Sequence, residues 1–217
     1  MRITLVVATK NKKKLEEIRV ILKGLRVNLV SLADFPQAPN IVENGLTFQE
    51  NAAKKALTIA RFTGELTLGE DSGICVDALD GKPGVYSARF AGNGKSDEKN
   101  NAKLLRLLDG IPNARRKAYY AAAVALADKN GLIGVVEGRC KGVIGFKPEG
   151  TFGFGYDPLF VIPKYKKTFA QLGPRIKHSM SHRYRALVKA QKLLSKYINK
   201  TNKTRSAAES RTPAQYQ

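Results

Sequence analysis

The chain has 217 residues, 43% of them hydrophobic and 26% charged, which is close to the average for soluble globular proteins. That composition excludes a wholly disordered chain, a collagen and a disulfide-stapled miniprotein, and no apolar run approaches the ~20 residues that a membrane-spanning helix needs. With 38 Lys and Arg against 18 Asp and Glu, the formal net charge is +20, which points either to a polyanionic partner or to no more than a solubilising surface.

The first thirty residues predict the start of an α/β fold. The run from Ile3 to Val7 is rich in β-branched residues, and apolar residues recur every three to four positions from Leu15 to Leu25, which indicates a helix. Val27 to Val30 predicts a second strand. The order strand, helix, strand is typical of a parallel pair of strands.

The middle of the chain predicts two further helices and a turn. Thr47 and Glu50 have the spacing of a capping box, so a helix should run from there to about Phe62. The segment from Glu70 to Gly73 is expected to form an acidic turn between two short strand pieces. Ser96 or Asp97 should cap a helix that reaches Leu108.

The second half predicts a long hairpin and a last helix. Residues 117–127 and 133–146 are β-rich, and the turn sequence from Asp128 to Gly131 joins them. A short strand follows near residues 159–162, and Ser181 should cap a helix that ends near residue 198. We therefore expect one domain over residues 1–198 and a disordered polar tail over residues 199–217.

A basic segment between the first strand and the first helix is a candidate phosphate site. In an open α/β sheet ligands bind beyond the carboxyl ends of the strands, and a helix N-terminus there offers free N–H groups and a positive dipole end. The alternative is a solvated basic turn. The segment consists of six consecutive residues, Thr9, Lys10, Asn11, Lys12, Lys13 and Lys14.

Acidic residues in two segments are candidate metal ligands. Glu70 and Asp71 are adjacent, and such a pair is costly to bury without a cation, so near phosphate-binding lysines it implies Mg²⁺. The alternative is an ordinary acidic turn. Near Glu43, a predicted helix places Asn51 and Lys55 one turn apart on one face, whereas Glu50 is better explained as a helix cap.

An aromatic, Gly-rich segment and a basic segment are candidates for binding a base. Gly153 to Pro158 lets the backbone approach a ligand closely, and Phe154 offers a face on which a base could stack, although core aromatics beside a turn would have the same pattern. Lys177 to Arg183 supplies donors that could read base carbonyls or bind anions.

Taken in order, these segments resemble the inosine/xanthosine triphosphate pyrophosphatase family, from Thr4 to about Tyr197. The chain departs from the family pattern in having Gly69-Glu70 where Ala-Asp is usual, Lys13 where Gly is usual, and a single acid, Glu43, before the second helix. The matching motifs are T-x-N-x-x-K at 9–14, T-F-x-E-N-A-x-x-K-A at 47–56, D-S-G at 71–73, G-x-P-G-[IV]-Y-S-A-R-[FY] at 81–90, G-F-G-Y-D-P at 153–158 and K-x-x-x-S-H-R at 177–183.

The resemblance implies an elongated, two-lobed mixed α/β fold, with a central mixed sheet, a long antiparallel arm and the active site in the cleft. It also implies hydrolysis of inosine, deoxyinosine and xanthosine triphosphates to the monophosphate and pyrophosphate. Asp71 would be the catalytic proton acceptor, and Asp71 and Glu43 would hold Mg²⁺. The other substrate-binding residues that it implies are Ser72 and Lys55 with the Thr9–Lys14 segment at the phosphates, and Phe154, Gly155, Tyr156, Asp157, Lys177, His182 and Arg183 at the base.

Expected partners and alternatives follow from the same patterns. The resemblance implies a homodimer, and no membrane or specific nucleic-acid binding is expected. The first residues predict a strand and not a signal peptide, and Cys75 and Cys140 are typical of reduced thiols, so we expect a cytoplasmic protein. One alternative is a nucleic-acid-binding module that uses the basic surface. The other is a related pyrophosphatase that acts on modified pyrimidine nucleotides.

Overall fold

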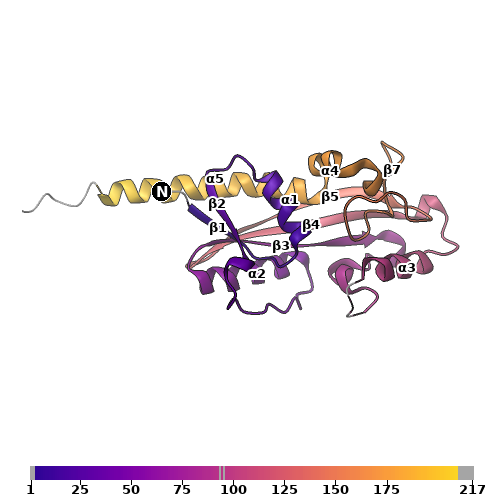
Figure 1. The fold of residues 1–217 in the computed structure, drawn as a ribbon, viewed down its shortest axis with the longest axis horizontal. Coiled ribbons are helices and arrows are strands. Elements are labelled where there is room, and N and C mark those ends of the chain that lie inside the picture. The colour runs from indigo at the N-terminus through magenta and orange to yellow at the C-terminus, as the bar shows by residue number, and fades with distance from the viewer. Residues whose placement is uncertain (1–2, 93, 95, 210–217) are drawn as a thin grey trace, which may run out of the picture.

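The computed structural model describes residues 3–92, 94 and 96–209 and contains one seven-stranded mixed sheet, drawn in Figure 1. The strands lie in the order β2-β1-β3-β4-β5-β6-β7. Their bounds are β1 (Ile3–Val7), β2 (Val27–Ser31), β3 (Leu66–Val76), β4 (Lys117–Asp128), β5 (Gly131–Ile144), β6 (Phe160–Ile162) and β7 (Lys167–Thr168).

The sheet combines a parallel part with a long antiparallel part. β1 pairs in parallel with β2 and β3, whereas every pairing from β3 to β7 is antiparallel. β4 and β5 are the two longest strands and form the predicted hairpin. The predicted fold class, an elongated mixed α/β fold with an antiparallel arm, is confirmed (Figure 1).

Helices cover both faces of the sheet. In Figure 1, α2 and α3 lie on one side of the strands, and α1, α4 and α5 lie on the other. Their bounds are α1 (Lys12–Ile21), α2 (Phe48–Thr63), α3 (Asp97–Leu107), α4 (Phe169–Met180) and α5 (His182–Glu209), and a 3₁₀ turn, η3 (Gly84–Arg89), precedes α3.

The two faces are packed differently. Beneath α2 the contact consists of small residues, Ala52 and Ala56 on the helix against Ala123 and Ala125 on β4. A Cβ atom at Gly69 of β3 would stand 2.2 Å from the Ala52 carbonyl oxygen, so this contact requires glycine. The opposite face carries a core of larger aliphatic side chains beneath α1 and α5. The small-residue face therefore holds α2 close to β3, which brings their polar side chains together.

One predicted turn is wrong. Residues 70–73 were expected to form an acidic turn between two strand pieces, but β3 runs unbroken from Leu66 to Val76 and pairs with β4 throughout. Glu70 and Asp71 are buried within the sheet, with 2% and 5% of their surface exposed. Adjacent acids can stay in a strand here because cationic side chains from other elements reach both of them.

The C-terminal region also differs from the prediction. The tail expected to be disordered from residue 199 instead continues α5 to Glu209, because residues 199–209 contain neither Gly nor Pro and are rich in good helix formers. Residues 210–217 of that predicted tail lie outside the described residues. Ser181 does cap α5, since its Oγ accepts from the Tyr184 N–H at 3.1 Å. Among the residues described, none of the helices has the length and apolarity to span a bilayer.

Candidate active site

A cavity of about 340 Å³ gathers residues from distant parts of the chain. The end of β1, the starts of α1 and α5, the middle of β3 and the 154–157 loop all contribute to its wall. Every predicted site residue lines this cavity except Lys12 and Lys13. Both of these lysines are exposed on the first turn of α1, and the Lys13 Nζ lies 5.9 Å from the centre of the Phe154 ring.

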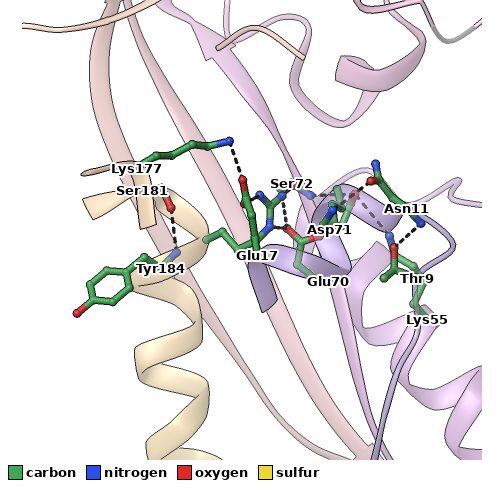
Figure 2. Close-up of polar contacts among 12 residues, drawn as sticks. Thr9, Asn11, Glu17, Lys55, Glu70, Asp71, Ser72, Lys177, Ser181 and Tyr184 are labelled. Carbon is green, nitrogen blue, oxygen red and sulfur yellow. Dashed lines mark hydrogen bonds and ion pairs between the residues drawn. The ribbon is translucent and has the colours of Figure 1, made fainter. Parts of the chain in front are cut away.

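At one end of the cavity lies the N-terminus of α1, with its capping residue Asn11. Asn11 caps the helix, its Oδ1 accepting from the Lys14 N–H at 3.1 Å, and the Thr9 Oγ1 accepts from the Asn11 N–H at 3.1 Å (Figure 2). The first turn of the helix contains no acid. Free N–H groups, a positive dipole end and the side chains of Lys10 and Lys14 therefore lie at this end of the cavity, a combination that suits a phosphate chain.

The acidic centre of the cavity is built from α2 and β3. Asn51 donates from Nδ2 to the Asp71 Oδ2 at 3.0 Å, and the Lys55 Nζ lies 3.7 Å from the Asp71 Oδ1 and 2.6 Å from the Glu43 Oε1. Burial raises the pKa of Asp71, against the opposing pull of Lys55. Glu43 is also partly desolvated, but the Lys55 ammonium holds the pKa of this carboxyl below its usual range. Of the two carboxyls, Asp71 is thus the one whose pKa burial raises.

The donor set fits a divalent cation that is shared with a phosphorylated ligand. Glu43 and Asp71 face the same ammonium group, and the Glu43 side chain is 36% exposed, whereas the Asp71 side chain is 7% exposed. Within residues 3–92, 94 and 96–209, no three His, Cys, Asp or Glu side chains converge as a metal cage. Mg²⁺ needs only one or two protein carboxylates when phosphate oxygens and water complete its octahedron. A cation here would relieve the unfavourable charge of Asp71.

Glu70, next to Asp71, has a different role. Its Oε2 lies 2.9 Å from the Lys14 Nζ and its Oε1 lies 3.1 Å from the Arg183 Nη2. These two cations outweigh the cost of full burial and hold the pKa of Glu70 far below its usual range. A carboxylate held this firmly in its ionised form is a poor proton acceptor, so of the two adjacent acids Asp71 is the better base.

From Glu70 a chain of alternating charges continues to the other end of the cavity. Arg183 also pairs with Glu17 of α1, and Glu17 accepts from the Lys177 Nζ at 2.8 Å. Lys177 in turn donates to the Asp157 Oδ2 at 2.6 Å. Figure 2 shows Glu17 and Glu70 at the centre of this network. Since all of these side chains are buried, the positions of the groups at the two ends depend on one another.

Sequence reasoning missed Glu17. Its burial, at 6% exposure, follows from contacts with residues more than 150 positions away. The one local signal is its spacing, because Glu17 follows Lys14 by three residues and so shares its helix face.

The far end of the cavity has an aromatic platform and a buried imidazole. The Lys177 Nζ lies 4.5 Å from the centre of the Phe154 ring. His182 stacks on Tyr120 with 4.5 Å between ring centres and 10° between planes. Burial, together with the charges of Arg183 and Lys177, holds the pKa of His182 well below its usual range, so the imidazole is neutral. Its Nδ1 is buried and has no hydrogen-bond partner among the described residues.

Comparison with known proteins places this site in a family. A sequence profile of the Ham1 family matches residues 5–193. The dITP/XTP pyrophosphatase of Desulforamulus reducens is 52% identical over 196 residues, which cover 90% of this chain and 98% of that relative. The dITP/XTP pyrophosphatase of Geobacter sulfurreducens is 52% identical over 183 residues, covering 84% and 92%.

Solved structures agree with the sequence comparison. A HAM1 protein from Coxiella burnetii superposes with a TM-score of 0.82 at 35% identity, covering 89% of this chain and 99% of the other. The nucleoside-triphosphatase / dITP/XTP pyrophosphatase of Mycobacterium abscessus superposes with a TM-score of 0.71 at 42% identity, covering 87% and 97%.

Proposed function

The chain belongs to the Ham1 family, and we propose that it hydrolyses the triphosphates of inosine, deoxyinosine and xanthosine to the monophosphate and pyrophosphate. The observation that carries this proposal is that one cavity is lined by the N-terminal turn of α1, which suits a phosphate chain, by hydrogen-bond donors and an aromatic face, and by Asp71. Removal of non-standard purine nucleotides from the nucleotide pool is the function that follows.

In this proposal Asp71 takes a proton from the attacking water. The Asp71 Oδ2 is occupied by Asn51, and the Oδ1 also accepts from the Ser72 backbone N–H at 3.0 Å, so the carboxylate is held in one orientation. Its raised pKa suits proton uptake better than the strongly depressed pKa of Glu70. The water oxygen then bonds to the α-phosphorus, and the bond between the α-phosphorus and the oxygen that bridges to the β-phosphorus breaks. The leaving group is pyrophosphate.

We propose Mg²⁺ as the cofactor, held by Asp71 and Glu43 together with the phosphates. Bound there, it would neutralise the charge of the phosphate chain. Lys14, Lys55 and the Thr9–Asn11 turn would bind the phosphate oxygens, with Lys10, Lys12 and Lys13 adding positive charge around the entrance. Lys55 already bridges Glu43 and Asp71 and is therefore placed to exchange one of these partners for a phosphate.

Base selection would follow from the donors at the far end of the cavity. Lys177 and Arg183 can only donate hydrogen bonds, so they favour a purine with an oxygen acceptor at position 6 and disfavour the 6-amino group of adenine. The neutral His182 would supply one more contact to the base edge, and Phe154 would stack on the ring. Gly155, Tyr156 and Asp157 would shape this end, with Asp157 orienting Lys177.

We further propose a cytoplasmic homodimer. Both cysteines are buried free thiols, as is usual in a reducing compartment. Exposed apolar side chains flank the metal-binding segment, with Val42 at 63% and Leu46 at 83% exposure, which supports an interface on this side of the molecule. Sedimentation velocity at micromolar concentration tests the assembly, and a single monomeric species would contradict it.

A nucleic-acid-binding module would explain the basic surface but not the buried acids Glu70 and Asp71. Salt-dependent retention on DNA without triphosphate hydrolysis would favour that alternative. Faster hydrolysis of modified pyrimidine triphosphates than of inosine triphosphate would favour the second alternative, a related pyrophosphatase that acts on modified pyrimidine nucleotides.

The deciding experiment incubates the purified chain with Mg²⁺ and a panel of purine and pyrimidine triphosphates. We expect pyrophosphate and inosine monophosphate from inosine triphosphate, at a rate far above that for ATP. Release of orthophosphate and a diphosphate would show that the wrong bond is assigned.

A further inference from the structure

Two side chains of helix α3 hold the backbone of the base-binding loop. The Asp97 Oδ2 accepts from the Gly155 N–H at 2.7 Å, and the Asn101 Nδ2 donates to the Gly155 carbonyl oxygen at 3.0 Å. Both backbone polar groups of Gly155 are therefore bound by side chains one helical turn apart. Gly155 has a φ of +64°, so this is a tight left-handed turn that few other residues adopt.

The hydrogen bonds to Gly155 also constrain Phe154, because the backbone of Phe154 is itself hydrogen-bonded to Asp157. The Phe154 N–H donates to the Asp157 Oδ2 at 2.9 Å, and the Phe154 carbonyl oxygen accepts from the Asp157 N–H at 3.3 Å. Since Asp157 also accepts from Lys177, the aromatic platform and a base-reading ammonium share one anchor. The position of the Phe154 ring relative to Lys177 thus depends on whether Gly155 stays in place.

The Asn101 side chain leaves one of its polar atoms unpaired. It is 7% exposed, and its Oδ1 is buried with no hydrogen-bond partner among the described residues. An unpaired buried amide oxygen destabilises a fold, and an apolar side chain of similar size would avoid that cost. The hydrogen bond from the Asn101 Nδ2 to the Gly155 carbonyl oxygen explains why an amide is present here.

The preceding residue, Asn100, has the same side chain and a different target. Its Oδ1 accepts from the Ala91 N–H at 2.7 Å, and its Nδ2 donates to the Ala88 carbonyl oxygen at 3.4 Å. Both targets lie in or just after η3, and neither belongs to the 154–157 loop. Asn100 is 3% exposed, so the two asparagines match in type, helix and burial and differ in the segment that they hold.

We propose that Asn101 is a positioning residue for base selection, which sets the place of the Phe154 platform through the Gly155 backbone without touching the nucleotide. This inference rests on the proposed function, since it assigns the 154–157 loop to the base. Asp97 supports the same turn but lines the cavity itself, so Asn101 is the cleaner residue to test.

The test measures binding of inosine and adenosine monophosphates by titration calorimetry without Mg²⁺, so that catalysis plays no part. For Asn101→Ala we expect the affinity for inosine monophosphate to fall about tenfold, the effect of about one lost hydrogen bond, and the preference over adenosine monophosphate to narrow. Asn100→Ala is the matched control, and its preference between the two nucleotides should equal that of the wild type.

A second variant separates positioning from folding. Asn101→Leu keeps the number and branching of the side-chain heavy atoms and removes both the unpaired Oδ1 and the Nδ2 donor, so it should still melt cooperatively while the base preference is lost. An unchanged preference in Asn101→Leu, or equal losses in the two alanine variants, would overturn the inference alone. A wild-type protein that binds both monophosphates equally would overturn the proposed base selection, and this inference with it.

Discussion

The amide of Asn51 on α2 donates to the carboxylate of Asp71 on β3 across 3.0 Å, and the Asn51 Oδ1 accepts in turn from the Gly45 N–H at 2.8 Å. A helix and a strand are thus joined at the carboxylate that we assign as the base. Asn51 is 1% exposed, so water does not compete for this hydrogen bond. Together with the Ser72 N–H on Oδ1, the contact fixes the orientation of the Asp71 carboxylate.

The first prediction concerns Asp71→Asn. An amide keeps the shape of the side chain but cannot accept a proton at neutral pH, so kcat should fall about 10²- to 10⁴-fold from loss of the base, and further from weakened metal binding. The change removes a negative charge that faces the phosphates, so nucleotide affinity should be retained or increase. Steady-state kinetics and a thermal melt check this. A kcat within a few-fold of the wild type would place the base elsewhere.

The second prediction concerns the acid side of the pH profile. Because burial raises the pKa of Asp71, the active ionised form should be lost, as the pH falls, at a higher pH than for an ordinary aspartate. The Lys55 charge opposes this shift, so Lys55→Met should move the acid limb to still higher pH. The measurement is kcat/KM against pH, which reports groups of the free enzyme. If the acid-side fall in kcat/KM occurred at lower pH in Lys55→Met than in the wild type, the assignment of Asp71 as the base would be contradicted.

The third prediction concerns acid stability. Burial alone would raise the pKa of Glu17, but Arg183 and Lys177 lower it from 4.5 to about 2. A depressed carboxyl pKa contributes stability that is complete above the unfolded value of 4.5 and is lost as the pH falls from there toward 2. In Glu17→Gln the free energy of unfolding should depend less on pH between about 2 and 4.5. At neutral pH it should be lower than in the wild type by about 3–5 kcal/mol, because two buried cations lose a partner.

Urea unfolding between pH 2 and pH 7 measures both effects of Glu17→Gln. The control is Glu16→Gln, since Glu16 is exposed on the same helix, and its profile should follow that of the wild type. Equal profiles for the Glu17 and Glu16 variants would show that the buried network adds little to stability.

The fourth prediction concerns the close packing of α2 on β3. A Cβ atom in Gly69→Ala would stand 2.2 Å from the Ala52 carbonyl oxygen and 2.7 Å from the Ala56 nitrogen, and backbone atoms in a helix cannot move aside cheaply. We expect a loss of about 3 kcal/mol or more, and reduced activity because α2 carries Asn51 and Lys55. Gly94→Ala is the control, as nothing lies within 4 Å of its added Cβ.

Local signals in the sequence predicted helices α1, α2, α3 and α5 and the hairpin, but not helix α4 (Phe169–Met180). Thr47 and Ser96 cap α2 and α3 as expected, each accepting from the N–H three residues on, and the turn before Gly131 joins β4 to β5. Such features depend on residues within about four positions of one another, so their physics is visible in the linear chain. The resemblance of the motifs to those of a known family also implied which segments would form one site.

Only the tertiary structure decided how the charges are arranged. The pair Glu70–Asp71 looked like a turn, because isolated adjacent acids are unfavourable in a buried strand. Arg183, 113 positions from Glu70, and Lys14 neutralise Glu70 inside the sheet, whereas Asp71 pairs with Lys55 at the longer distance of 3.7 Å. Whether each carboxyl stays firmly ionised, as Glu70 does, or is better suited to accept a proton, as we propose for Asp71, is therefore set by its distance to cations that the fold brings near. Electrostatic energy depends on spatial separation and burial, and not on separation along the sequence.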